Sequence, residues 1–312
     1  MKVLQRFLLT LSLLQLFTWV DTLTVRHHSF PNDTLSPTQW RRSNAFSSPS
    51  PVSTYNETTA MYLAHITSVS YCHIQHIIEW NCQPCTLVSR LSGVKVVEDA
   101  KDNFQGLVGY SHLYNALVIA FRGSIDVTNW INNITFLKKR AYAHFPDVMV
   151  HEGFYWTYRS VALQVVSILQ QLRQQYPNTS VMVAGHSLGG AVAAICAFEL
   201  EYIEKIPVKA LYTFGKPRVG NTKFSARLRN ASMDVYRLTH FRDIVPHLPP
   251  TWTGFEHTSE EIFYDQFSAT YRACSLLDGE DPTCSNTCSP FSCTSIVDHL
   301  TYMNISMSHL VC

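Results

Sequence analysis

A serine lies in the pattern Gly-x-Ser-x-Gly, formed by Gly185, Ser187 and Gly189. The apolar run VMVA before it is typical of a buried strand, and the run AVAAICAFEL after it is typical of a buried helix. A sharp strand-to-helix turn strains the serine backbone and needs small residues two positions before and after the serine. Such a turn holds the hydroxyl at a helix N-terminus, where free N–H groups can stabilise a developing oxyanion. Ser187 is therefore the candidate nucleophile.

A serine hydroxyl needs a histidine to remove its proton and a carboxylate to orient that histidine. Enzymes with a serine elbow on an α/β sheet carry both partners after the serine, with the acid first. Asp243, in HFRDIVPHLPP, follows a predicted strand, and His299 lies later, in SIVDHLTYM. His240, His247 and His257 compete with His299 for the role of base, and spacing alone does not separate them.

Strand-like and helix-like segments that could position these residues alternate along the chain. The continuously apolar segment 116–121 predicts a central strand covered on both faces, and 151–176 predicts an amphipathic helix. Further elements are predicted over 188–204 (helix), 208–214 (strand) and 234–238 (strand). The alternation predicts one α/β-hydrolase-type domain, with a mainly parallel central sheet and helices on both faces. Beyond Pro250 we expect a loop-rich region.

Composition narrows the classes of partner. The 312 residues are 46% hydrophobic and 15% charged, which is enough to bury one large core. A formal net charge of +1 gives no field that would favour nucleic acid or a strongly acidic partner. We therefore expect an uncharged or apolar partner and no nucleic acid. The sequence makes no prediction of the oligomeric state.

The N-terminus resembles a targeting segment. Lys2 and Arg6 precede an apolar run that ends at Val20, which predicts a secretory signal peptide over 1–22. Because the run is short and interrupted by polar residues, a stable membrane span is disfavoured. Residues 23–55 are rich in Ser, Thr and Pro and predict a disordered pro-segment or linker, which places the folded domain at 56–312.

Glycosylation sequons and cysteines fit a secreted, extracellular chain. An odd total of nine cysteines leaves at least one free thiol, and Cys196, within the apolar helix, is the expected one. The Cys82-x-x-Cys85 pair could be half of a zinc site or a redox motif, but an oxidising compartment favours a disulfide. We expect no metal and no cofactor. The sequons begin at Asn32, Asn56, Asn133, Asn178, Asn230 and Asn304.

Several motifs in register carry a resemblance to a known family. VIAFRGS, HEGFYWTY, GHSLGG, FGKPRVGN, HFRDIVPHLPP and DHLTYM, with the pair YC…NCQPC, resemble the class 3, fungal-type triacylglycerol lipases over about residues 56–312. The resemblance implies a catalytic triad of Ser187, Asp243 and His299, and an oxyanion hole at Ser124 and Leu188. It further implies the disulfides Cys72–Cys312, Cys82–Cys85 and Cys274–Cys284, which leaves Cys288 to pair with Cys293. Lys216 stands where the family often has serine.

The segment after Ser124 predicts one short amphipathic helix. Val127, Trp130, Ile131 and Ile134 recur at helical spacing, with polar residues on the opposite face. Such a face could pack permanently in the core, whereas the resemblance implies a lid that covers the site in water and opens at an oil–water or membrane interface.

These observations predict a secreted serine hydrolase that cleaves carboxyl esters of lipids, with triacylglycerols as the expected substrate. A phospholipase A1 or a feruloyl-type esterase on the same fold is the alternative within the enzyme class. A catalytically inactive, lipase-like binding protein is the alternative outside it, and the intact set of Ser, Asp and His disfavours it.

Overall fold

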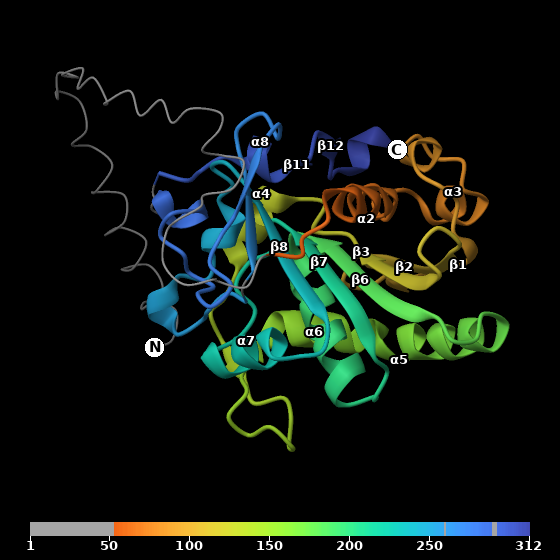
Figure 1. Cartoon of the computed structure of the whole chain (residues 1–312), viewed down its shortest axis with the longest axis horizontal. Coiled ribbons are helices and arrows are strands. Elements are labelled where there is room, and N and C mark those ends of the chain that lie inside the picture. Colours follow the sequence, from red (N-terminus) through yellow and green to blue (C-terminus); the bar gives the residue numbers. More distant parts are fainter. Residues whose placement is uncertain (1–52, 259, 289–291) are drawn as a thin grey trace, which may run out of the picture. The chain divides into compact units, whose positions relative to one another are not determined.

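A computed structural model describes residues 53–258, 260–288 and 292–312 (Figure 1). The predicted signal peptide and nearly all of the predicted pro-segment lie outside these residues. Thr54 and Tyr55, at the end of the predicted linker, already contact the folded domain. The Thr54 hydroxyl lies 2.7 Å from the Tyr236 hydroxyl, and the Tyr55 ring lies against the rings of Tyr236 and Tyr271.

A sheet of eight strands forms the centre of the domain, in the order β1-β2-β3-β6-β7-β8-β9-β10. The pairs β3–β6, β6–β7, β7–β8 and β8–β9 are parallel, and the outer pairs are antiparallel. The prediction of a mainly parallel sheet is confirmed. The strands are β1 (Ser92–Asp99), β2 (Phe104–Ser111), β3 (Ala116–Phe121), β6 (Ser180–His186), β7 (Val208–Phe214), β8 (Asp234–His240), β9 (Glu261–Tyr264) and β10 (Tyr271–Ala273).

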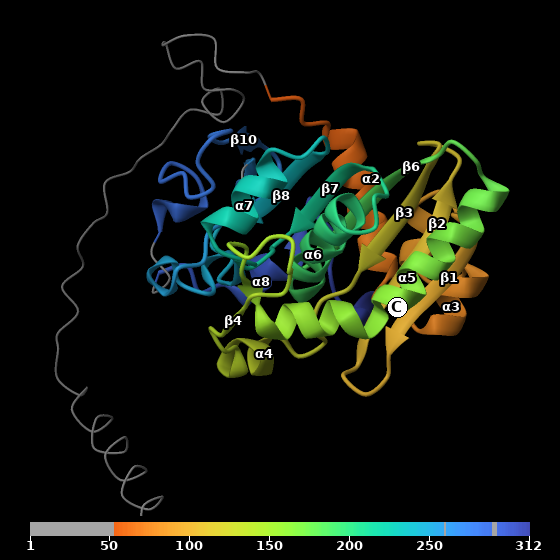
Figure 2. The same ribbon diagram turned by 90° about the horizontal axis from the view of Figure 1, so that it is seen from below.

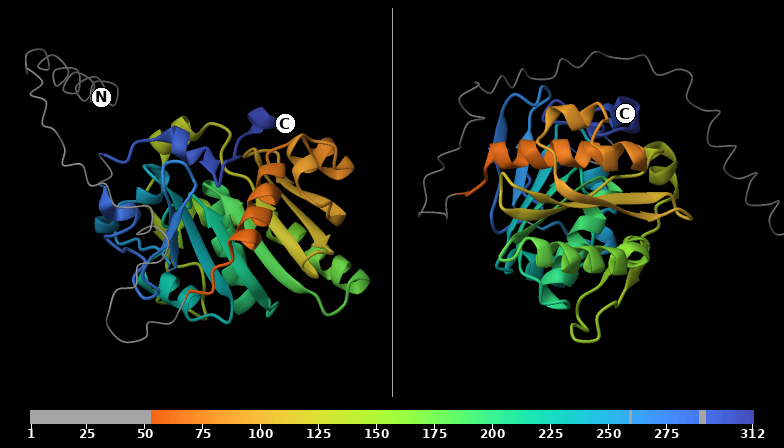
Figure 3. Two further views of the ribbon diagram at one scale, coloured as in Figure 1. Left: turned by 45° about the horizontal axis from the view of Figure 1, so that its top comes forward. Right: turned by 90° about the vertical axis from the view of Figure 1, so that its right-hand side faces the viewer.

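Helices cover both faces of this sheet (Figure 3). On one face α2 (Glu57–Val69) shares a core cluster with Val118 of β3, and on the other α5 (Glu152–Gln175) and α6 (Leu188–Tyr202) share a second core cluster with Ile119. Because successive side chains of a strand point to opposite faces, a strand covered on both sides is apolar at every position. This explains why the run at 116–121 is continuous.

The region beyond Pro250 is more regular than we expected. It contributes β9 and β10 to the central sheet, and β9 continues the parallel set beside β8. The two strands have four and three residues, and β9 begins with a buried glutamate, so neither gives a recognisable strand pattern.

Short elements border the end of the sheet that carries the site. Figure 2 shows α4 and β4 beside the beginning of α5. Among the described residues, no helix is both long enough and apolar enough to cross a membrane. The remaining elements are α3 (Ile74–Glu79), α4 (Val127–Asn133), β4 (Lys138–Lys139), β5 (Val150–His151), α7 (Thr222–Arg229), α8 (Ile296–His299), β11 (Thr301–Tyr302) and β12 (Ile305–Ser306).

Four disulfides have the pairing that the resemblance implies. Cys72–Cys312 links the segment after α2 to the C-terminal residue, over a sequence separation of 240. A cross-link over so long a loop removes the most entropy from the unfolded chain. Cys196 is buried and free. The other disulfides are Cys82–Cys85, Cys274–Cys284 and Cys288–Cys293.

Candidate active site

Ser187 lies in the sharp turn between β6 and α6. Its φ is +56°, a left-handed conformation that is costly for any residue but glycine. A Cβ on Gly185 would lie 2.2 Å from the backbone oxygen of Gly189, and a Cβ on Gly189 would lie 2.3 Å from that of Phe121. Both flanking positions therefore require glycine, because strand, turn and helix approach each other so closely.

The surroundings of the Ser187 hydroxyl leave it available for chemistry. Its oxygen is buried and has no hydrogen-bond partner. Leu188 is the first residue of α6, so its N–H has no acceptor within the helix. Gly123 follows the end of β3 by two residues and lies close to Ser187: a Cβ on Gly123 would be 2.6 Å from the Ser187 Cβ. The next residue, Ser124, donates its hydroxyl to the backbone oxygen of Asp126 at 3.1 Å.

Asp243 and His299 are in direct contact. Nδ1 of His299 lies 2.9 Å from both carboxylate oxygens of Asp243, and both side chains are buried. The carboxylate also accepts hydrogen bonds from the Val245 N–H at 2.8 Å and from the Tyr302 hydroxyl at 2.5 Å. A backbone bridge between Asp243 and Ser295 brings α8, which carries His299, beside the loop after β8. The carboxylate thus fixes the orientation of the imidazole.

The contact determines which ring nitrogen of His299 is free. A carboxylate only accepts hydrogen bonds, so Nδ1 carries the proton that faces Asp243. Nε2 is buried and without a partner, and in the neutral ring it bears a lone pair. The site therefore combines a free hydroxyl with a free proton acceptor, and a carboxylate that stabilises the protonated ring.

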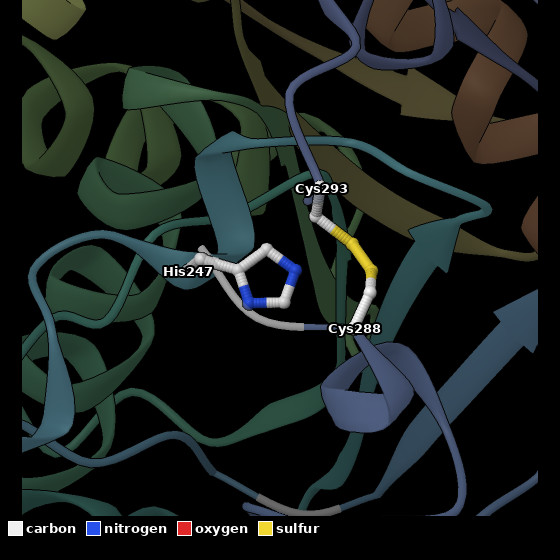
Figure 4. Close-up of side chains that lie close together, drawn as sticks. All are labelled: His247, Cys288 and Cys293. Carbon is white, nitrogen blue, oxygen red and sulfur yellow. A yellow bond between two sulfur atoms is a disulfide. The ribbon is translucent and has the colours of Figure 1, made fainter. Parts of the chain in front are cut away.

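The other candidate histidines contact backbone carbonyls or a disulfide. Nδ1 of His240 lies 2.9 Å from the Asp298 oxygen, and Nε2 of His257 lies 2.7 Å from the Pro246 oxygen. The His247 ring lies beside the Cys288–Cys293 disulfide (Figure 4). Of the four histidines, His299 is the one whose ring contacts the Asp243 carboxylate.

Two groups of side chains among the described residues have the spacing of metal ligands. They are His247, Cys288 and Cys293, and Glu261, Cys274 and Cys284. In both groups the two cysteines form a disulfide with each other, so they offer no thiolate to a metal.

Three residues at the site were not identified from the sequence as part of it. The Tyr71 hydroxyl lies 2.5 Å from Nδ1 of His186 and accepts a hydrogen bond from the Gly123 N–H at 2.8 Å. Burial holds the pKa of His186 well below its usual range, so this ring is neutral. Gly215, at φ +57°, lies against the acid and the base, since a Cβ there would be 2.8 Å from Oδ2 of Asp243. All three residues stand in motifs already singled out, Tyr71 in the pair YC…NCQPC, but nothing in those motifs indicates that Tyr71 and His186 meet.

The helix α4 begins at Val127, three residues after Ser124. Asp126 caps α4 by accepting a hydrogen bond from the Asn129 N–H at 2.9 Å. Val127 is buried, and the Trp130 ring stacks on Phe154 of α5 at 6.2 Å between centroids. Ile131 and Ile134 are half-buried, with Ile134 at the C-terminal cap. In this state the apolar side of α4 faces the protein and its polar side faces water.

Known proteins are similar to this chain in sequence and in fold. Residues 118–252 match the family model of class 3 lipases. The chain is 35% identical to a lipase of Rhizomucor miehei over 256 residues, which are 80% of this chain and 69% of that one. It is 33% identical to a secreted mono- and diacylglycerol lipase of Fusarium solani over 65% of this chain and 62% of that one. A solved triacylglycerol lipase, described as having a serine protease triad as its catalytic centre, superposes with a TM-score of 0.74 at 32% identity, covering 84% of this chain and 98% of that one.

Proposed function

The chain belongs to the class 3 lipases, and from that premise we propose that Ser187, His299 and Asp243 are the catalytic triad of a lipid ester hydrolase. Its relatives are lipases, and the chain is accordingly a carboxylic ester hydrolase of the triacylglycerol lipase type. The observation that carries the assignment of the triad is the contact between Asp243 and Nδ1 of His299, which leaves Nε2 of the same ring free. The Ser187 hydroxyl is likewise buried and without a partner.

The reaction follows from these positions. The Ser187 oxygen attacks the ester carbonyl carbon while its proton passes to Nε2 of His299, and Asp243 stabilises the resulting imidazolium. The backbone N–H groups of Leu188 and Ser124 stabilise the oxyanion. His299 then gives the proton to the departing alcohol. Water, deprotonated by His299, attacks the acyl-enzyme, releases the fatty acid and restores Ser187.

Triacylglycerol is the proposed substrate, and partial glycerides are the second candidate. The similarity to a triacylglycerol lipase structure supports the first, and the similarity to a mono- and diacylglycerol lipase supports the second. We propose α4 as a lid, because it follows the oxyanion-hole segment and has one apolar side. Emulsified triolein, diolein, monoolein, phosphatidylcholine and methyl ferulate, assayed side by side, separate the candidate substrates.

Secretion is part of the proposal. We propose residues 1–22 as a signal peptide, 23–55 as a pro-segment or linker and 56–312 as the lipase domain. Four disulfides support an oxidising compartment, and the Fusarium solani relative is named as secreted.

Covalent labelling tests the triad. A serine-directed phosphonate should label wild-type protein at Ser187 and should not label Ser187→Ala, whose hydrolysis rate should fall by about 10⁴- to 10⁶-fold. His299→Ala should be almost as damaging, whereas the exposed Ser160→Ala should keep full activity. Labelling at another serine, or turnover in Ser187→Ala, contradicts the assignment.

A further inference from the structure

Exposed aromatic and aliphatic side chains gather beside the C-terminal end of α4. The Phe136 and Trp252 rings meet edge to face, with 6.5 Å between their centroids. Trp252 is 81% exposed and Leu137 is 60% exposed. Trp156, on the first turns of α5, is 53% exposed and lies under the Lys139 ammonium, 4.8 Å from the ring centroid. Large apolar side chains exposed together mark a contact surface.

Basic side chains accompany these rings. Lys138, Lys139 and Arg140 are consecutive, and the Lys138 ammonium donates a hydrogen bond to the Thr253 oxygen beside Trp252. Arg140 is exposed and donates a hydrogen bond to the Pro146 backbone oxygen. The next residue, Asp147, pairs with Arg227 at 3.7 Å. One acidic residue adjoins them: Glu152, the first residue of α5, donates its N–H to the Leu137 oxygen at 2.9 Å, so the three cations outnumber it. We call Phe136, Leu137, Trp156, Trp252 and the three basic residues the aromatic–basic patch.

This combination of side chains fits one kind of partner. Tryptophan rings and long basic side chains together are typical of protein surfaces that lie at a lipid–water interface, where rings enter the apolar layer and cations stay with the head groups. The patch is continuous in the chain with α4, which adjoins the proposed oxyanion hole. A surface bound there would lie next to the proposed lid.

We propose that the aromatic–basic patch binds a lipid surface that carries fatty-acid carboxylates. This inference rests on the proposed function, because ester hydrolysis itself releases fatty acids whose carboxylates remain at the lipid surface. The rings supply binding to any lipid surface, and the three cations add binding that grows as product accumulates. The patch therefore keeps the enzyme on a partly digested lipid particle.

Vesicle sedimentation tests the proposal with full-length Ser187→Ala protein, which cannot change the lipid during the measurement. Vesicles of phosphatidylcholine alone are compared with phosphatidylcholine vesicles that contain ionised oleate. In this background Trp252→Ser should weaken binding to both. Lys139→Gln with Arg140→Gln should weaken binding to the oleate vesicles by about fivefold per charge removed, leave the other vesicles unchanged, and reduce the salt sensitivity to the share that Lys138 supplies.

Matched controls lie at the opposite end of the sheet. Leu113 is 65% exposed in the turn between β2 and β3, and Lys209 of β7 is also exposed. Leu113→Ser and Lys209→Gln should therefore bind both kinds of vesicle as the parent protein does. Three outcomes would overturn the proposal. Trp252→Ser could bind both kinds of vesicle as the parent does, or the basic variant could lose equal binding on both. The third is a dimer that forms without lipid and that Trp252→Ser dissociates. Hydrolysis of a dissolved short-chain ester by the same patch variants with Ser187 restored should stay at the wild-type rate. If protein with Ser187 hydrolyses no ester, the proposed function fails instead.

Discussion

Nε2 of His186 lies 2.8 Å from the backbone oxygen of His299, so the residue before the proposed nucleophile holds the segment that carries the proposed base. A carbonyl only accepts, so Nε2 of His186 carries the proton, and Nδ1 of the neutral ring accepts the hydroxyl proton of Tyr71. The Tyr71 oxygen in turn accepts from the Gly123 N–H. One buried chain of hydrogen bonds thus joins Gly123, beside the proposed oxyanion hole, to His186, beside the proposed nucleophile, and to the backbone of the proposed base.

This chain predicts a kinetic effect for a residue that does not touch substrate. Tyr71→Phe leaves the Gly123 N–H and Nδ1 of His186 buried without partners, at a cost of about 1–3 kcal/mol in the free energy of unfolding for each. Because misplacement of catalytic groups can cost up to about a hundredfold, kcat on a dissolved ester should fall by about ten- to a hundredfold.

Tyr62→Phe is the matched control for Tyr71→Phe. Tyr62 lies in α2, and its hydroxyl is also buried and donates a hydrogen bond to the Ser111 hydroxyl at 2.8 Å. Its loss should lower the free energy of unfolding and leave kcat unchanged. Equal kcat values for Tyr71→Phe and Tyr62→Phe would show that the hydrogen-bond chain has only a structural role.

Gly215 gives a second prediction about the geometry of the site. A Cβ there would lie 2.8 Å from Oδ2 of Asp243 and 2.9 Å from Nδ1 of His299, so Gly215→Ala should push acid and base apart. We expect kcat to fall by up to about a hundredfold. Gly254→Ala is the control, because Gly254 also has a positive φ, of +77°, but only the flexible end of Lys138 faces it. Both variants should lose about 1–2 kcal/mol of stability from backbone strain, and only Gly215→Ala should lose activity.

The elbow was predictable because its requirements are local. Gly185, Ser187 and Gly189 are close in sequence, and each glycine is required by an approach of backbone within the same turn. The run at 116–121 was predictable because burial on both faces makes every position apolar. The same reasoning failed for β9. Its first residue, Glu261, is fully buried and pairs with Arg237 of β8 at 2.9 Å, and its carboxylate also accepts hydrogen bonds from the Thr239 hydroxyl and the Ser285 N–H. A sequence does not reveal these partners.

Long-range contacts explain what else the sequence could not predict. Tyr71 and His186 are 115 residues apart and meet only because the segment after α2 folds over the end of β6. The Cys72–Cys312 disulfide, adjacent to Tyr71, fixes that segment to the C-terminus. The proposed nucleophile was therefore recognisable from its own turn, whereas the groups that position it relative to the proposed base depend on the assembled fold.

Glu280 predicts a pH dependence of stability. Burial raises the pKa of this carboxyl, but two hydrogen bonds from Arg218, at 2.8 and 2.6 Å, and the nearby Arg237 charge outweigh burial and bring the pKa down to about 2. A carboxyl whose pKa is lower in the folded state stabilises the fold above its unfolded pKa, near 4.5, and loses that contribution as the pH falls towards 2.

Denaturant unfolding of wild type and Glu280→Gln at a series of pH values measures this contribution. At neutral pH the wild type should be more stable by up to about 3 kcal/mol, the amount that corresponds to the lowered pKa. The difference should shrink between pH 4.5 and 2, where the wild-type carboxyl becomes protonated and resembles the amide. A difference that stays constant over this range would mean that the Arg218 pair does not control the pKa.

The last prediction concerns Trp130 and decides whether α4 is a lid or a fixed helix. In the described state Trp130 stacks on Phe154, and the apolar side of α4 is partly buried against the protein. Apolar surface gains about 25 cal/mol per Å² on burial, whether protein or lipid covers it, so a lipid surface can stabilise an open position of α4. Hydrolysis of a short-chain triglyceride should therefore rise sharply once the ester exceeds its solubility limit. Trp130→Ser should weaken that rise and keep turnover of dissolved ester, whereas Leu163→Ser, exposed on α5, should leave the rise unchanged. Smooth saturation through the solubility limit, identical in all three proteins, would identify α4 as a fixed part of the core and the enzyme as an esterase of dissolved substrates.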